Sequence, residues 1–267
     1  MNQASLDLSR VFDLEFHGPD TYVGESPPYE WGRIYGGLVV AQALWAATQT
    51  VSPEYEAHSL HAYFILGGDL SEPVRYEVDR VRNGRSFTTR RVVARQSGGA
   101  ILTLGCSFQR PEPGPDVQTA DFPTDAGDPE TLTSLPDAGI QVAYLPPREK
   151  PPTLRCWARL PIDTGDDPRL HACGLAYLSD LNAIGAIART HPGEHPAPEE
   201  WDDRFMSASL DHAVYFHRPA RPDRWLFLEM QGHGLIRSRG LATGQLFDAA
   251  GPHVATIVQE GLLREKR

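Results

Sequence analysis

Cysteine and long apolar runs are scarce in this sequence. Its 267 residues contain three cysteines, Cys106, Cys156 and Cys173, and no Cys-x-x-Cys pair. This pattern excludes a disulfide-stapled scaffold and predicts free thiols in a reducing compartment. No run of 18 apolar residues occurs, so no membrane span is expected. The first residues lack a basic segment followed by an apolar core, so we expect no signal peptide and a cytoplasmic location.

Basic residues are also in the minority. The sequence holds 25 Lys and Arg against 35 Asp and Glu, a formal net charge of −10. A nucleic-acid-binding protein normally presents a basic face, so this balance argues against a nucleic-acid partner. Residues 111–140 contain seven acids and no Lys or Arg, and residues 111–152 contain ten of the 23 prolines. We interpret 111–152 as an acidic, Pro-rich surface linker between an N-terminal unit, 1–110, and a C-terminal unit, 153–267.

Each unit shows the same predicted plan, a helix followed by an antiparallel meander. Residues 36–50 are small and apolar nearly all round, which is typical of a buried helix. Hairpin turns are expected at Asn83-Gly84, at Ser97-Gly98-Gly99 and at 248–251. The predicted strands of the first unit are 58–66, 73–82, 86–96 and 100–109. For the second unit we predict a helix at 171–189 and strands at 206–216, 224–231, 235–248 and 253–263. This plan indicates an α+β fold in which each sheet covers an apolar helix.

A faint repeat relates polar residues of the two units. Ser59 and Gln109 recur as Ser209 and Gln259, and 50 residues separate the members of each pair. Their contexts also match, HSLHAYF against ASLDHAVYF and SFQR against IVQEG. The repeat predicts a duplicated unit.

The helices before these pairs differ at one position. The second carries Asp180 in GLAYLSDL, where the first has Gln42 in GGLVVAQAL. A carboxylate in an apolar helix is costly to bury unless it is hydrogen-bonded or used, although an acid at a helix end on a polar rim is the simpler explanation. The hydroxyl of Ser209 and the amide of Gln259 can hold a water but cannot deprotonate it. Asp180 is therefore the candidate general base of a single working site.

A nucleophilic serine is a competing hypothesis, because Ser209-Leu210-Asp211-His212 contains all three residue types of a catalytic triad. Along a continuous strand, Ser209 and Asp211 would share one face and His212 would point to the other, so we expect no relay among them. No Gly-x-Ser-x-Gly elbow is present. Asp211 still competes with Asp180 for the role of the acid.

Two letter matches to cofactor motifs fail on their context. His191-Pro-Gly-Glu194-His195 matches a zinc-protease motif, but Pro192, Gly193 and Pro196 exclude the continuous helical turn that the motif needs. Gly232-His233-Gly234 lacks the third glycine of a dinucleotide fingerprint. We therefore expect neither a metal nor a redox cofactor.

Seven arginines lie between residues 75 and 95. We favour a solvated strand face for them. The alternative is a cradle for ligand phosphates, with Arg85 and Arg90 as candidates. Gly36-Gly37 opens the first helix and could present free N–H groups to an oxyanion. His61 completes the candidate substrate-binding residues.

In its motifs the sequence resembles the bacterial acyl-CoA thioesterase II family. The matching segments occur in order over residues 15–110 and 153–264 and include IYGGLVVAQAL, HSLHAYFILGGD, NGRSFTTRRVVARQ, LAYLSDL, ASLDHAVYFHRP and VATIVQEGLLR. The resemblance implies a double hotdog, two tandem units of a long buried helix wrapped by an antiparallel sheet. Leu38 stands where a Gln is common, and HAYFILGGD lacks the family's Arg-Pro pair. Both departures bear on acyl and coenzyme A preference.

The resemblance also implies hydrolysis of acyl-CoA to a free fatty acid and coenzyme A by an activated water, without a covalent intermediate. The catalytic residues would be Asp180, Ser209 and Gln259. Acyl-CoA is the expected partner, and the sheet edges favour a homo-oligomer. Two alternatives stay open: an acyl-CoA hydratase of the same fold, which would need His58 or His61 at the thioester, and a non-catalytic acyl-CoA binder.

Overall fold

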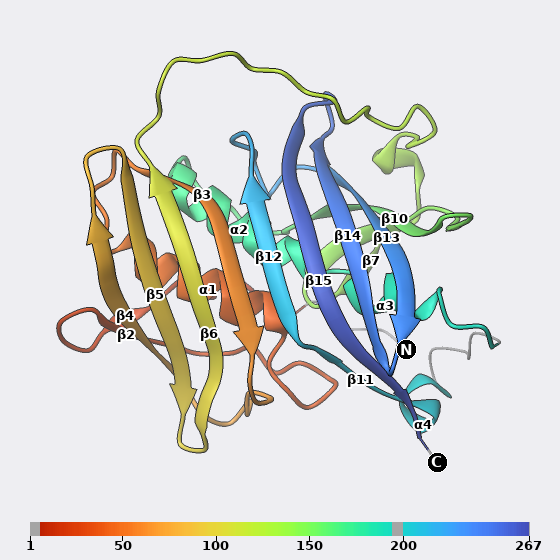
Figure 1. Cartoon of the computed structure of the whole chain (residues 1–267), viewed down its shortest axis with the longest axis horizontal. Helices are drawn as coiled ribbons and strands as arrows, with labels where there is room; N and C mark the ends of the chain where they lie inside the picture. The colour runs from red at the N-terminus through yellow and green to blue at the C-terminus, as the bar shows by residue number, and fades with distance from the viewer. Residues whose placement is uncertain (1–5, 194–199, 267) are drawn as a thin grey trace.

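The computed structural model describes residues 6–193 and 200–266, in which a single large antiparallel sheet lies in front of the helices (Figure 1). Neighbouring strands follow the order β1-β2-β4-β5-β6-β3-β12-β15-β14-β13-β10-β8-β7, while β11 pairs with β15 and β9 with β10. The strands of the first half are β1 (Glu15–Phe16), β2 (Thr21–Gly24), β3 (Glu56–Phe64), β4 (Val74–Asn83), β5 (Phe87–Gln96) and β6 (Gly99–Gln109).

The second half supplies the remaining strands and most of the helices. Its strands are β7 (Leu135–Asp137), β8 (Ile140–Tyr144), β9 (Arg148–Glu149), β10 (Pro152–Arg159), β11 (Phe205–Ser209), β12 (Asp211–Phe216), β13 (Leu226–Ile236), β14 (Arg239–Asp248) and β15 (His253–Glu265). The helices of the chain are α1 (Gly36–Thr48), α2 (Pro168–Ser179), α3 (Ala183–Ala188) and α4 (Trp201–Arg204), with a short 3-10 helix, η1 (Pro129–Thr131).

Helix α1 is buried along almost its whole length, as its composition predicts. Every residue except Gly36 and Trp45 is buried, and the helix packs against β4, β5 and β6 on one side and against α2 on the other. The predicted strands of the first half are confirmed with small shifts at their ends. Along β5, for example, buried and more exposed residues alternate, which is the pattern of a strand with one face on the core.

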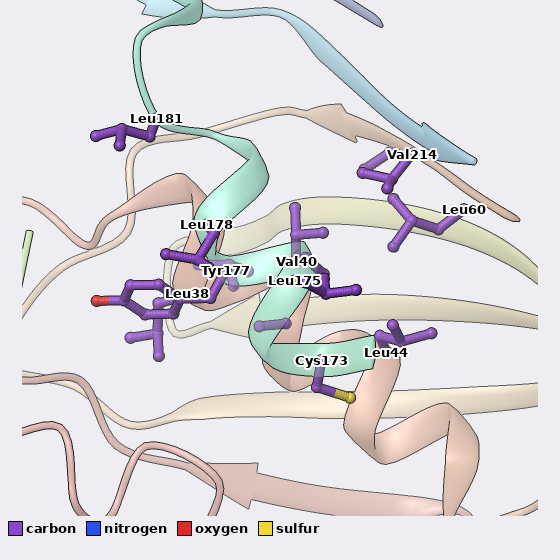
Figure 2. Close-up of a cluster of buried hydrophobic side chains, with 14 of the residues drawn as sticks. Leu38, Val40, Leu44, Leu60, Cys173, Leu175, Tyr177, Leu178, Leu181 and Val214 are labelled. Atoms are coloured by element: carbon purple, nitrogen blue, oxygen red, sulfur yellow. The ribbon is translucent and has the colours of Figure 1, made fainter. Parts of the chain in front are cut away.

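The two halves of the molecule join where β3 pairs with β12. Val214 of β12 lies opposite Leu60 of β3, and His212 lies opposite Ala62. Figure 2 shows Leu60 and Val214 beside the apolar side chains of α1 and α2, all of them in one core cluster. Full burial of a side chain of this size contributes about 1.5–3 kcal/mol. The join is therefore part of the main core and not a separate interface.

The second half contains two breaks where continuous elements are predicted. The helix predicted at 171–189 is interrupted after α2, because Asn182 adopts a left-handed backbone with φ 70° and α3 begins only at Ala183. Asn tolerates this conformation better than most residues. The strand predicted at 206–216 is interrupted at Leu210, between β11 and β12. Both breaks lie beside candidate site residues, since Asp180 follows α2 and Ser209 ends β11.

The boundary between the strands predicted at 224–231 and 235–248 is also placed differently. Strand β13 continues through Gly232-His233-Gly234 with a bulge between Gly232 and Gly234. The chain turns instead at Arg237-Ser238, where both residues have positive φ, of 51° and 62°. Two consecutive left-handed residues make the turn that matches the twist of a hairpin. The hairpin turn at 248–251 is confirmed, with Gly251 at φ 107°.

The surface-linker interpretation of 111–152 is wrong for its second part. After β6 the chain crosses to the far edge of the sheet (Figure 1), where β7, β8 and β9 add to β10. Ile140 and Val142 are buried there. Phe122 also packs against Trp157, at 6.1 Å between ring centroids. The high content of Pro and Asp in 111–152 favoured a loop, although buried and less buried residues alternate at the start of β8.

Cys106, Cys156 and Cys173 are free and buried. Among residues 6–193 and 200–266, no helix is long and apolar enough to cross a membrane.

Candidate active site

The candidate site lies where the start of α1 meets the end of α2. Gly36 is the first residue of α1, and Asp180 is the residue that caps the C-terminus of α2. Asp180 and Ser209 both line a pocket of about 540 Å³, a size typical of small-ligand sites. The apolar residues of its wall are Trp31, Ile34, Tyr35, Val39, Phe64, Ile65, Leu66, Ile101, Ala138, Ile184, Ala208 and Leu210.

The Asp180 side chain is half-buried, and its carboxylate is held by hydrogen bonds. Its Oδ1 accepts from Gln259 Nε2 at 2.9 Å, and it also accepts from the N–H of Gly37. Burial raises the pKa of the Asp180 carboxyl above its ordinary value, and positive charge on His212, when its ring is protonated, and the hydrogen bonds to the carboxylate oppose that rise. Because the positive end of α1 faces it, the carboxylate has a favourable partner despite its burial. A carboxylate with a raised pKa is a stronger base than an exposed one.

Gln259 of β15 connects the other polar groups. Its Nε2 donates to Ser209 Oγ at 2.7 Å as well as to Asp180, so both amide hydrogens are used. Its Oε1 lies 2.6 Å from His212 Nδ1. Gln259 itself is fully buried and does not line the pocket. Ser209 and Gln259 are thus directly hydrogen-bonded. Ser209 lines the pocket, whereas Gln259 lies behind the pocket wall.

His212 lies on the side of the sheet that the sequence argument excluded. A continuous strand would place it opposite Ser209, but the interruption at Leu210 shifts the alternation. As a result, Ser209 and His212 both contact Gln259. They still form no triad, because Gln259 lies between them. The prediction that His212 points away from Ser209 is therefore wrong. A serine relay is still not formed, because Ser209 and His212 do not contact each other.

Asp211 does not compete for the role of the acid. Its Oδ1 accepts the N–H of Glu260 at 2.6 Å, and its side chain is not part of the pocket wall. Of these two acids, Asp180 is the one that lines the pocket.

The first half does not form a matching site. Ser59 lies opposite Ser107 and Tyr215, whereas Gln109 lies opposite Glu56, further along β3, and no hydrogen bond joins Ser59 to Gln109. Gln109 lines a second, smaller pocket of about 170 Å³.

Gln42, the counterpart of Asp180 in the repeat, has a structural role. Its Nε2 donates to the carbonyl groups of Val11 at 2.8 Å and Glu25 at 3.0 Å, and its Oε1 accepts from the Tyr76 hydroxyl at 2.6 Å. The amide therefore ties α1 to the N-terminal segment and to β4.

Three candidate substrate-binding residues lie outside the pocket. His61 is exposed and packs edge-on against Tyr215, at 5.4 Å between ring centroids. Arg85 is exposed in the turn between β4 and β5. The guanidinium of Arg90 is buried and donates to the hydroxyl and the carbonyl of Thr50 and to Asn83 Oδ1. Their role as ligand contacts stays a prediction of the sequence, since none of the three lines the pocket that contains Asp180.

The other arginines of residues 75–95 follow the interpretation that we favoured. Arg80 pairs with Asp20 at 2.7 Å and Arg91 with Asp79 at 2.9 Å, and their side chains are largely solvated. These pairs form on the outer face of the strands. The stretch is a largely solvated strand face, and the phosphate cradle stays an alternative from the sequence.

Gly36 and Gly37 differ in what they can offer to an oxyanion. The N–H of Gly37 is engaged by Asp180. The N–H of Gly36 belongs to the first turn of α1, whose N–H groups have no partner inside the helix. A Cβ atom at Gly36 would lie 2.6 Å from Asp180 Oδ2, so only glycine permits this close approach.

The remaining sequence candidates also fall away from the pocket. His58 lines the second pocket, with its Nε2 buried and without a hydrogen-bond partner among the described residues. A hydratase would need His58 or His61 at the thioester, and neither lies there. Glu194 and His195 of the zinc-protease letters lie outside the described residues. Within 6–193 and 200–266, no group of three His, Cys, Asp or Glu side chains could hold a metal ion.

Three polar residues of the pocket escaped the sequence reasoning. Asp137 at the end of β7 lines it, and burial raises the pKa of this carboxyl, against the hydrogen bond from Tyr144. Asn182 and the exposed Arg33 line it as well. Arg33 lies three residues before Gly36, and this closeness to the start of α1 could have identified it as a candidate site residue. Nothing in the sequence distinguishes Asp137 from the other acids of its segment.

Comparison with known proteins agrees with this architecture over nearly the whole chain. The family model of the acyl-CoA thioesterase N-terminal domain matches residues 26–109, and that of the acyl-CoA thioesterase C-terminal domain matches residues 112–263. Human acyl-coenzyme A thioesterase 8 is 33% identical over 98% of this chain and 90% of its own length. Acyl-CoA thioesterase 2 of Haemophilus influenzae is 32% identical over 97% of this chain and 95% of its own.

Solved structures point the same way. A protein with a hotdog fold from Alicyclobacillus acidocaldarius, 20% identical, superimposes with a TM-score of 0.75 over 95% of this chain and 96% of its own. The acyl-CoA thioesterase II TesB2 of Mycobacterium marinum, 35% identical, reaches a TM-score of 0.82 over 96% of each chain. This chain is therefore a hotdog-fold protein. It belongs to the acyl-CoA thioesterase family.

Proposed function

We propose that this chain hydrolyses acyl-CoA thioesters to a free acid and coenzyme A, using a water that Asp180 deprotonates. The observation that carries the proposal is a half-buried carboxylate with a raised pKa that lines a pocket. Family membership supports the reaction, and the geometry of the pocket supports Asp180 as the base. The repeated helix-and-meander plan further supports a double hotdog.

In the proposed reaction, the general base lies at the C-terminal end of α2 and the oxyanion donor at the N-terminal end of α1. Asp180 takes a proton from water, and the resulting hydroxide attacks the thioester carbonyl. The oxyanion that develops is stabilised by the N–H of Gly36 at the positive end of α1. The C–S bond then breaks, and coenzyme A leaves as a thiolate that takes up a proton. Ser209 Oγ accepts from Gln259 and its hydroxyl donates to the Asp180 carboxylate, so its remaining lone pair is what can accept a hydrogen from the attacking water.

Gln259 acts on this reaction from behind the pocket wall. Both hydrogens of its Nε2 are bound, one to Asp180 Oδ1 and the other to Ser209 Oγ. It therefore fixes the spacing of the base and the hydroxyl, and we assign it a positioning role in place of the direct water contact expected from the sequence.

The apolar wall suits the acyl chain, and its aromatic part is rigid. Tyr29 and Trp31 stack at 4.9 Å between ring centroids, and Tyr35 packs edge-on against Tyr177 at 5.1 Å. The Tyr177 hydroxyl donates to the carbonyl of Ala138 at 2.6 Å. Such a wall can select acyl groups by size. Release of free thiol from acyl-CoAs of increasing chain length tests the proposed function and measures the length that the pocket accepts.

A variant at Ser209 separates water attack from acyl transfer to serine. We expect Ser209→Ala to lower kcat by about 10- to 100-fold, the value of a hydrogen bond to a charged or reacting group. No acyl group should appear on the protein in rapid-quench mass spectrometry. Ser207→Ala, two residues away on β11 and outside the pocket, is the matched control and should retain wild-type rates. An acylated peptide containing Ser209 would refute attack by water.

Arg33 is the candidate contact for the phosphates of coenzyme A. It is exposed on the pocket rim and forms no ion pair with any described residue. We expect Arg33→Ala to raise KM by about two- to fivefold at low ionic strength, the range of an exposed ion pair, and the difference to fade at high salt. Arg33→Lys should stay near wild type. A thioester without phosphates should show no change, and an equal change with that substrate would contradict the assignment.

The oligomeric state and the cellular location are also proposals. Among the described residues the sheet has exposed ends at β1 and β7, which favours assembly into a homo-oligomer, and sedimentation velocity would measure it. A cytoplasmic location stays a prediction of the sequence.

A further inference from the structure

A buried pair behind Gln259, His212 and Ser179, has no part in the chemistry described above. We propose that His212 is a positioning residue, a neutral imidazole with its proton on Nδ1 that holds the amide of Gln259 in its working orientation, and that Ser179 supports this tautomer by donating to the unprotonated Nε2. The proposal rests on the proposed function, because the amide is what spaces Asp180 and Ser209.

The hydrogen bonds of Gln259 decide which atom of His212 carries a proton. Nε2 of Gln259 is committed to Asp180 and Ser209, so its other amide atom, Oε1, faces His212. An amide oxygen can only accept. The 2.6 Å contact between Gln259 Oε1 and His212 Nδ1 therefore requires a hydrogen on Nδ1. A rotated amide would turn Oε1 toward the Asp180 carboxylate, where two acceptors would face each other.

Ser179 is the partner of the other ring nitrogen. Its Oγ lies 2.7 Å from His212 Nε2 and 2.8 Å from the carbonyl of Ala176. With a neutral ring, the hydroxyl donates to Nε2. If the ring took a second proton, Nε2 would donate to Oγ, and the hydroxyl would turn to Ala176. Ser179 is the last residue of α2, so it also ties the ring to the helix end that carries Asp180.

The surroundings of the ring keep it neutral at ordinary pH. His212 and Ser179 are both buried, with exposed fractions of 1% and 0%. Burial lowers the pKa of His212, while two carboxylates, Asp180 at the end of α2 and the adjacent Asp211, work in the opposite direction. A neutral donor on Nδ1 can orient the amide without adding a charge that would lower the basicity of Asp180.

Loss of the Nδ1 donor should therefore affect the chemical step and not substrate binding. His212 does not line the pocket, so acyl-CoA does not touch it. Without the donor, Gln259 Oε1 has no partner and the amide can rotate away from Asp180. A displacement of about 1 Å at a catalytic group can cost about 100-fold in rate.

Two substitutions at one position test the donor. The side-chain nitrogen of Asn can occupy the place of His Nδ1, whereas Leu fills similar space with no donor. We expect His212→Leu to lower kcat by about 30- to 100-fold with little change in KM. His212→Asn should recover most of that loss. Equal losses in both variants, or wild-type kcat in His212→Leu, would overturn the positioning role.

A measurement on the unmodified chain does not depend on how the variants fold. Nitrogen-15 NMR of histidine-labelled protein distinguishes the two tautomers, and the His212 signals are those missing in His212→Asn. We expect a protonated Nδ1 and an unprotonated Nε2 that changes its shift in Ser179→Ala. A proton on Nε2 alone would overturn the assignment. Thiol release by the wild type tests the proposed function separately, because the tautomer is observed whether or not the chain turns over acyl-CoA.

Discussion

Replacement of Asp180 by Asn is expected to lower kcat for acyl-CoA hydrolysis by about 1,000-fold, within the range that general bases contribute. The amide has almost the same shape as the carboxylate and can still accept from Gln259, but it cannot take a proton from water. Substrate binding should therefore persist. Free-thiol release measures the rate, and calorimetric titration with a non-hydrolysable acyl-CoA thioether measures the affinity.

Asp137→Asn is the matched control for this variant. Asp137 lines the same pocket and burial raises the pKa of its carboxyl too, so the two variants remove one half-buried acid each. We expect Asp137→Asn to keep kcat within about threefold, because its carboxylate has no link to Ser209 or Gln259. A large loss in Asp137→Asn with a small loss in Asp180→Asn would move the base to β7.

The pH profile of the wild type gives an independent readout of the same base. The raised pKa of Asp180 means that the carboxylate gains its proton at a higher pH than an exposed Asp does. Only the deprotonated form can act, so kcat/KM should fall as the pH drops through that raised pKa. The residual activity of Asp180→Asn should lack this acid limb.

Replacement of Gly36 by Ala is expected to lower kcat by about 100-fold, although a single methyl group is added. The new Cβ would lie 2.6 Å from Asp180 Oδ2 and 3.0 Å from Phe64 Cε1. Contacts this short force the carboxylate or the ring to move. Because Ala is a better helix former than Gly, α1 itself should not be weakened. The expected result is a folded protein, by circular dichroism and thermal melting, with poor turnover.

Gly67→Ala controls for the addition of a methyl group to the same pocket. Gly67 also lines the pocket, but a Cβ there would meet no atom within 4 Å. Its rates should stay close to those of the wild type. If both variants lose activity alike, the close approach of α1 to Asp180 is not what matters.

The residues of the site could be predicted from the sequence, but the hydrogen bonds among them could not. Asp180, Ser209 and Gln259 were identified by residue type and by the repeat, and the structure brings them together. Their bonds were not predictable, because Leu210 interrupts a strand whose alternation looks continuous in sequence. The structural roles of Arg90 and Gln42 were not predictable either. Their side chains donate to backbone carbonyl groups that come within reach only when the chain is packed.

The sequence by itself determined the local elements and the chemical inventory. Alternation of apolar residues specifies the strands of the first half, and small apolar residues specify α1, because both patterns act between neighbours along the chain. Tertiary structure alone decided that the start of α1 meets the end of α2, that β3 pairs with β12 and that Asp137 enters the pocket. These contacts join residues far apart in sequence, so they depend on strand register and helix packing, which no local pattern encodes.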